Sequence, residues 1–271
     1  MLPRVLTWAQ PVGRWANLVE VNEWEPAPRE SLKGINALSI AVIGFLVGYL
    51  FATIYVLVEL TVTGAPANAT ATNSLGALIA NLLGLWTGLL AAVIYASKKR
   101  GSGSLRSDFG LYRIALQDVV IGVPIGILGQ LVIIPLLYYP FEHMIPNLSE
   151  KLSQPAQTIT GLGHGFGLLI LALFLAVGAP IVEELYFRGL LLGSLKYRFS
   201  RFPESVSSFL AAVISALLFG LAHGEPLQLL GLAFFGLILA AMRLKFGRLG
   251  PGMFAHGAFN AVTLIALIKI H

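Results

Sequence analysis

Long runs of apolar residues with few or no charges recur along this chain and restrict its fold more than any other feature. A helix needs about 20 mostly apolar residues to cross the roughly 30 Å of hydrocarbon in a bilayer. Only 11% of the 271 residues are charged, whereas soluble domains average about 25%. We therefore expect an all-α transmembrane bundle of about seven spans, at residues 38–60, 77–95, 119–138, 166–199, 205–223, 226–242 and 251–270.

Basic residues gather in three of the connections between these spans, at 96–115, 196–204 and 243–248. The alternate connections are neutral or slightly acidic. Cytoplasmic loops of membrane proteins carry the excess of Lys and Arg, so this alternation predicts that the basic loops and the amino terminus are cytoplasmic. We expect an integral protein of a bacterial plasma membrane. The same distribution explains the isoelectric point of about 9.6 without nucleic-acid binding.

Residues 1–37 mix arginines, glutamates and tryptophans. They lack the order of a signal peptide, in which a charged region precedes an apolar one and a small-residue cleavage site. We expect a cytoplasmic or interfacial tail here, with an eighth span as the alternative. Residues 38–271 then form one transmembrane domain.

The fourth apolar segment contains three ionisable residues, Glu183, Glu184 and Arg188. Ionisable groups at membrane depth face the bundle interior or a wet cavity and by default mark a functional site. Glu184 and Arg188 are four residues apart, which places them on one helix face as an ion pair. Glu183 is rotated about 100° away and is expected to lack the arginine. A carboxylate without a cation beside it is the better candidate for a general base.

Two later segments also carry polar residues in apolar surroundings. His223 follows Phe219 by four residues at the end of the fifth segment, and His256 precedes Asn260 by four in the seventh. Together with the glutamates they supply a base, imidazoles and an amide that can stabilise an oxyanion. The alternative to a catalytic site is a purely structural role, in which Glu184 and Arg188 form a buried ion pair and the two histidines pack between helices.

Straight, upright helices would place His223 and His256 far apart, toward opposite ends of their spans. The sequence His223-Gly224-Glu225-Pro226 is rich in helix breakers and joins two short segments. We therefore expect a loop sunk into the bundle, which is tolerated where irregular backbone lines a cavity.

Several common catalytic motifs are missing from the sequence. It has no Gly-x-Ser-x-Gly elbow, no His-Glu-x-x-His pair and no cysteine, which argues against familiar serine, zinc and thiol proteases. Zinc binding by Glu183, His223 and His256 stays open on residue types alone. Activation of water by Glu183 and His223 without a metal is the equal alternative.

The ordered motifs Glu-Glu-x-x-x-Arg, Phe-x-x-x-His and His-x-x-x-Asn resemble the CPBP family, the CAAX-protease and bacteriocin-processing intramembrane endopeptidases. The resemblance covers about residues 115–270, and includes the type II CAAX prenyl endopeptidases. It implies peptide-bond hydrolysis in which Glu183 and His223 activate water and His256 and Asn260 stabilise the oxyanion. Glu184 and Arg188 would then brace the fourth helix or assist catalysis.

The resemblance also implies a peptide or protein substrate at the membrane, with CAAX-type processing as a family property. Relatives that act in bacteriocin immunity or as scaffolds supply the non-enzymatic alternative. A transporter with a proton-coupled glutamate is a third hypothesis, disfavoured because no internal repeat is present. Glycine pairs four residues apart, at 44/48, 84/88 and 122/126, predict close helix packing within the chain rather than dimerisation.

Overall fold

The structure, a computed structural model, describes residues 37–64 and 74–268. Every regular element in these ranges is helical, which confirms the predicted all-α fold. The tail predicted for residues 1–37, and the eighth span that it could contribute, lie almost wholly outside the described residues.

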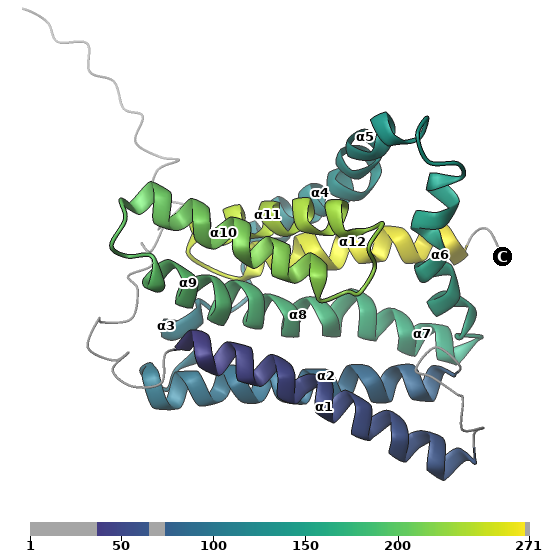
Figure 1. Cartoon of the computed structure of the whole chain (residues 1–271), viewed down its shortest axis with the longest axis horizontal. Coiled ribbons are helices and arrows are strands. Elements are labelled where there is room, and N and C mark those ends of the chain that lie inside the picture. The colour runs from purple at the N-terminus through teal and green to yellow at the C-terminus, as the bar shows by residue number, and fades with distance from the viewer. Residues whose placement is uncertain (1–36, 65–73, 269–271) are drawn as a thin grey trace, which may run out of the picture.

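Six helical stretches are long and apolar enough to cross a membrane, and each matches a predicted span within a few residues. They are Ala37–Thr63, Leu75–Arg100, Leu116–Phe141, Phe166–Arg198, Glu204–Leu221 and Leu229–Phe246. The seventh predicted span is helix α12, Gly250–Ile268. It is not among the six, although it runs along the same bundle (Figure 1). The protein is an integral membrane protein.

The spans divide into helical elements as follows. The first two are α1 (Ala37–Thr63) and α2 (Leu75–Arg100), and the third comprises α4 (Leu116–Leu128), η3 (Gly129–Ile133), α5 (Ile134–Tyr138) and η4 (Tyr139–Phe141). The fourth comprises α7 (Phe166–Leu173), η5 (Phe174–Gly178), α8 (Ala179–Glu183), η6 (Glu184–Leu191) and α9 (Leu192–Arg198). The fifth and sixth are α10 (Glu204–Leu221) and α11 (Leu229–Phe246), and the connections add α3 (Leu105–Phe109) and α6 (Leu148–Gly161).

Close glycine contacts join the helices in pairs. A Cβ on Gly88 of α2 would lie 2.3 Å from the Gly48 backbone of α1. A Cβ on Gly126 of α4 would lie 2.1 Å from the Ala255 carbonyl oxygen of α12. Small residues let helix backbones approach closely where lipid supplies no hydrophobic driving force. The predicted glycine pairs therefore pack helices within this chain.

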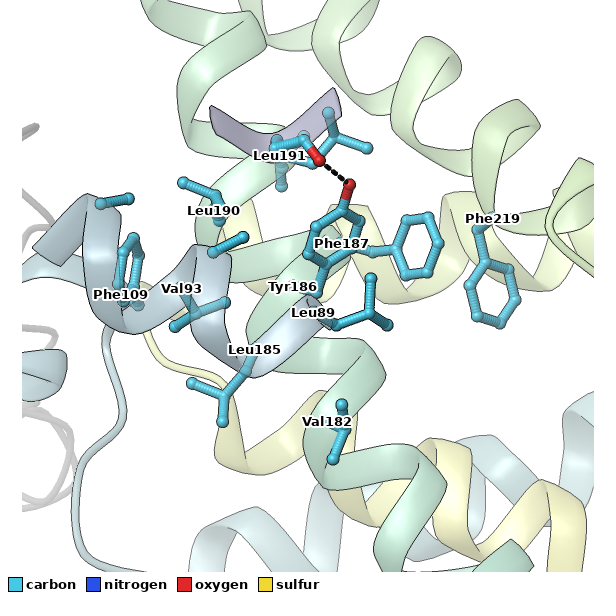
Figure 2. Packing of buried hydrophobic residues seen from close by; sticks show 14 of the residues in the cluster. Leu89, Val93, Phe109, Val182, Leu185, Tyr186, Phe187, Leu190, Leu191 and Phe219 are labelled. Carbon is cyan, nitrogen blue, oxygen red and sulfur yellow. Dashed lines mark hydrogen bonds between the residues drawn. The ribbon is translucent and has the colours of Figure 1, made fainter. Parts of the chain in front are cut away.

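The fourth segment lies at the centre of the bundle, and all eight residues of η6 are buried. Figure 2 shows its side chains Val182, Leu185, Tyr186 and Phe187 packed with Leu89 of α2 and neighbouring residues. The Tyr186 hydroxyl donates a hydrogen bond of 2.7 Å to the Ala41 carbonyl of α1, drawn as the dashed line. Because η6 is buried on all sides, its charged residues Glu184 and Arg188 lie inside the bundle and do not face lipid.

Two parts of this central segment, η5 and η6, are π-helical, which the sequence did not predict. The predicted continuous helix from Phe166 is otherwise confirmed, since the segment runs unbroken to Arg198 over 33 residues. π-helical turns occur mostly as single bulges and frequently at functional sites. Here one of them begins at Glu184, within the ionisable motif.

The three basic connections, α2–α3, α9–α10 and α11–α12, gather at one end of the bundle, on the left in Figure 1. At the other end lie α6, the start of α7 and the end of α12. The α10–α11 connection turns well before that end, so it lies within the length of the bundle (Figure 1). This agrees with the prediction of a connection that does not reach the far membrane surface.

We expect Gly88→Ala to destabilise the protein by about 1–3 kcal/mol, the usual cost of overpacking. The added methyl group has no space because the Gly48 backbone occupies its position. Gly161→Ala is the matched control, since nothing lies within 4 Å of a Cβ there. Thermal unfolding of the purified protein in detergent measures both, and equal midpoints for the two variants would contradict this account of α1–α2 packing.

Candidate active site

Both glutamates of the central segment contact one histidine of α12. His256 Nδ1 lies 3.3 Å from Glu184 Oε1, and His256 Nε2 lies 3.8 Å from Glu183 Oε2. The His256 side chain is almost wholly buried. Residues 72 or more positions apart in sequence thus meet at one point, where α12 packs against α8.

The predicted pair of Glu184 and Arg188 is confirmed. Arg188 Nη1 donates to Glu184 Oε1 at 2.9 Å, and both side chains are inaccessible. Arg188 Nη2 also donates to the Gly236 carbonyl of α11 at 3.1 Å, and the guanidinium carbon lies 4.2 Å from the centre of the Phe219 ring of α10. One buried cation therefore joins the central segment to two further helices.

Glu183 has different surroundings. Its side chain is 17% exposed, and no ion pair joins it to Arg188 among the described residues, as predicted. Its Oε2 atom is buried and accepts no hydrogen bond from any described residue. Buried polar atoms nearly always have a partner, so this oxygen is suited to a small donor such as water.

His223 lies in the connection that follows α10, where the chain turns at Gly224 with φ +70°. Its Nδ1 is 2.8 Å from the Phe219 carbonyl oxygen. A carbonyl can only accept, so Nδ1 carries the proton and Nε2 is left for other contacts. No direct hydrogen bond joins His223 to Glu183 in the described part of the chain.

The Phe219 ring lies between the two histidines. Its centre is 4.8 Å from that of His223 and 5.5 Å from that of His256. Upright helices were expected to hold His223 and His256 far apart. They lie closer because α10 ends at Leu221, within the length of the bundle, and because His256 lies almost two turns inside α12. The sequence singled out Phe219 only as part of a motif, and nothing in its spacing indicated that it contacts both histidines and Arg188.

Asn260, one turn beyond His256, binds the backbone of the central segment. Its Nδ2 donates to the Leu175 carbonyl of η5 at 2.8 Å. Gly257 of the same helix approaches the Ala176 carbonyl so closely that a Cβ would lie 2.7 Å from it. Asn260 thus satisfies a carbonyl of a π-helical turn, a contact that the sequence did not predict.

The zinc alternative finds no support in the geometry. Among residues 37–64 and 74–268, no three His, Cys, Asp or Glu side chains are grouped so that they could hold a metal ion. Glu183 and His256 are neighbours, with 3.8 Å between Glu183 Oε2 and His256 Nε2. The three residues named for zinc therefore do not form a ligand set here.

Removing only the cation of the buried pair should be more harmful than removing both charges. We expect Arg188→Met to cost about 3–5 kcal/mol, since it leaves Glu184 buried beside no cation. The double variant Glu184→Gln with Arg188→Met should recover part of that loss. Chemical unfolding in detergent compares the three proteins, and a double variant less stable than Arg188→Met would refute the pairing.

Comparisons with known proteins show which family this group of residues is similar to. Residues 165–262 match the family model described as type II CAAX prenyl endopeptidase Rce1-like. The matched range lies within the predicted 115–270 and includes all seven residues of the site, Glu183, Glu184, Arg188, Phe219, His223, His256 and Asn260. No curated protein and no solved structure matches the chain. Residues 165–262 are therefore similar to the Rce1-like type II CAAX prenyl endopeptidases of the CPBP family, whose members are membrane-embedded glutamyl-type proteases.

Proposed function

We propose that this intramembrane endopeptidase hydrolyses peptide bonds of membrane-associated substrates with Glu183 as its general base. The observation that carries the proposal is the contrast between two adjacent carboxylates. Glu184 is neutralised by Arg188 at 2.9 Å, whereas Glu183 Oε2 is buried without a hydrogen bond. Only Glu183 is free to accept a proton from water.

In the proposed reaction the Glu183 carboxylate takes a proton from a water molecule as the water oxygen attacks the scissile carbonyl carbon. The carbonyl oxygen becomes an oxyanion in a tetrahedral intermediate. Collapse of the intermediate breaks the carbon–nitrogen bond, and the Glu183 carboxylic acid returns its proton to the leaving amine. The products are a carboxylic acid and an amine, the acid then passes its proton to the amine or to solvent, and no other reactant is consumed.

His223 is proposed to assist the same water. Its Nδ1 proton is held by the Phe219 carbonyl at 2.8 Å, which fixes the tautomer and the plane of the ring. Nε2 of the neutral ring then presents a lone pair that can orient a water proton. The Phe219 ring, in contact with both histidines, sets the direction from which His223 approaches the site.

His256 and Asn260 are proposed to stabilise the oxyanion. Preorganised N–H donors aimed at developing charge are often the largest single contribution to catalysis. His256 is held in place between two carboxylates. Asn260 uses one N–H on Leu175, and an amide nitrogen has a second to offer. Glu184 and Arg188 hold this framework in place.

The substrate is proposed to be a peptide or protein at the membrane, and CAAX-type processing follows from the family match alone. The gathering of the basic connections at one end of the bundle supports a cytoplasmic location for that end and for the amino terminus. A bacterial plasma membrane is the proposed compartment.

Glu183→Gln should abolish cleavage while leaving the protein folded, because the amide keeps the shape of the carboxylate but cannot take the proton. We expect a loss of at least about 100-fold in kcat, in line with removal of a general base. A library of membrane-associated peptides, including prenylated CAAX peptides, is the substrate source. Glu150→Gln, on the exposed side of α6, is the control. A fully active Glu183→Gln protein would overturn the role of Glu183 as general base, and a wild type that cleaves none of the peptides would favour the scaffold alternative.

Metal chelators should leave the rate of peptide cleavage unchanged. The described residues contain no cluster that could hold a metal ion, and the proposed water activation uses a carboxylate and an imidazole. The same cleavage assay, run after prolonged incubation with EDTA or 1,10-phenanthroline, checks this expectation. Loss of activity that added zinc restores would overturn the metal-independent mechanism.

A further inference from the structure

The α10–α11 connection, residues 222–228, is tied to the rest of the bundle near both of its ends by tyrosine hydroxyls. Tyr49 of α1 donates to the Ala222 carbonyl at 2.8 Å. Tyr138 of α5 donates to the Leu227 carbonyl at 2.7 Å. Both tyrosines precede residue 165, so neither belongs to the segment that matches the protease family. Ala222 is the immediate neighbour of His223.

Tyr138 is a fully satisfied buried hydroxyl. Besides donating to Leu227, it accepts a hydrogen bond from the Gly231 amide at 3.0 Å. That amide belongs to the first turn of α11, where helix N–H groups have no partner within the helix. A Cβ on Gly231 would lie 2.9 Å from the Tyr138 ring, so the ring has room only because residue 231 has no side chain. One side chain thus fixes the end of the connection and the start of α11.

Tyr49 holds the beginning of the connection from a less protected position. Its side chain is 44% exposed, and its ring packs edge-on against Phe45, with ring centres 4.9 Å apart. The carbonyl that it binds belongs to the residue just after α10 ends at Leu221, where helix carbonyls lack partners within the helix. The bond therefore fixes the direction in which the chain leaves α10.

Between these two anchors the connection is held by backbone hydrogen bonds of its own turns, such as that from the His223 amide to the Gly220 carbonyl at 3.3 Å, and by few contacts with other helices. The only side-chain hydrogen bond from His223 in the described structure goes to Phe219. Gly224 adopts a left-handed conformation, and nothing lies within 4 Å of the position of its missing Cβ. The remaining side-chain tie, from Gln228 to the Leu152 carbonyl of α6, lies at the far end. Apart from the Gln228 bond, the hydrogen bonds that join this connection to helices other than α10 and α11 in the described structure therefore come from the two tyrosines.

We propose that Tyr49 and Tyr138 are positioning residues for His223, through which helices outside the family-matched segment complete the active site. This inference rests on the proposed role of His223 in water activation. A displacement of about 1 Å at a catalytic group can cost about 100-fold in rate, so loss of either hydroxyl should lower turnover. Substrate binding should change little, since neither hydroxyl is free to contact a peptide.

The kinetic test compares Tyr49→Phe and Tyr138→Phe with Tyr55→Phe. Tyr55 is a matched control because it is also an exposed tyrosine of α1 and makes no hydrogen bond among the described residues. We expect kcat to fall about tenfold in Tyr49→Phe and Tyr138→Phe, less than the roughly 100-fold loss that a 1 Å displacement can cause. KM should stay unchanged in both. Tyr55→Phe should have the kcat and KM of the wild type. In a His223→Ala background the Tyr49 and Tyr138 changes should have no further effect on residual turnover. Full additivity would show that the tyrosines act independently of His223 and would overturn the proposal.

A second measurement tests the anchoring without catalysis. The chain has no cysteine, so Glu225→Cys places a single thiol in the connection, two residues from His223. Maleimide labelling of the protein in detergent should be several-fold faster when Tyr49→Phe or Tyr138→Phe is added, and unchanged with Tyr55→Phe. Unchanged labelling in all three would refute the anchoring.

The two measurements separate this inference from the function on which it rests. A wild type that cleaves peptides, a Glu183→Gln variant that does not, and tyrosine variants with normal kcat would refute the inference alone. A wild type without activity would refute the proposed function, and the labelling rates would still decide whether the tyrosines hold the connection.

Discussion

The buried ion pair between Glu184 and Arg188 is the interaction on which the rest of the site depends. A charge removed from water costs several kcal/mol unless a partner and hydrogen bonds offset it. Arg188 obtains that compensation from three elements, through Glu184, the Gly236 carbonyl and the Phe219 ring. The central segment, α10 and α11 cannot separate there without exposing the guanidinium to hydrocarbon. Because Arg188 is committed to Glu184, the neighbouring Glu183 keeps an oxygen without a hydrogen bond.

The backbone of the central segment imposes a second constraint, because polar side chains in the neighbouring helices hydrogen-bond to it. Asn260 of α12 donates to the Leu175 carbonyl in η5, and Ser215 of α10 donates to the Phe187 carbonyl in η6. Both carbonyls lie in π-helical turns, and backbone groups at membrane depth must be satisfied by protein. Asn260 therefore links the geometry of the central segment to the proposed oxyanion site, since the same amide serves both.

Local features of the sequence predicted much of this arrangement. The spans could be placed because crossing a bilayer requires about 20 apolar residues, whatever the tertiary fold. The Glu184–Arg188 pair could be predicted because residues four apart share a helix face. The position of His256 between both glutamates could not, because it depends on how α12 is rotated against the central segment. The π-helical turns were also missed, since no residue pattern in 174–191 distinguishes them from an α-helix.

The same contacts distinguish the part of the chain that carries the proposed catalytic groups from the parts that hold those groups in place. All of the ionisable and amide groups proposed for catalysis lie within 165–262, on helices that Arg188 and Asn260 hold together. The connection that carries His223 is the exception, since the hydrogen bonds at its two ends come from α1 and α5. Backbone hydrogen bonds hold the start of this connection to the end of α10, and the two tyrosines add bonds from spans that precede the matched segment. The earlier spans are therefore more than a membrane anchor: they determine where one of the two histidines lies.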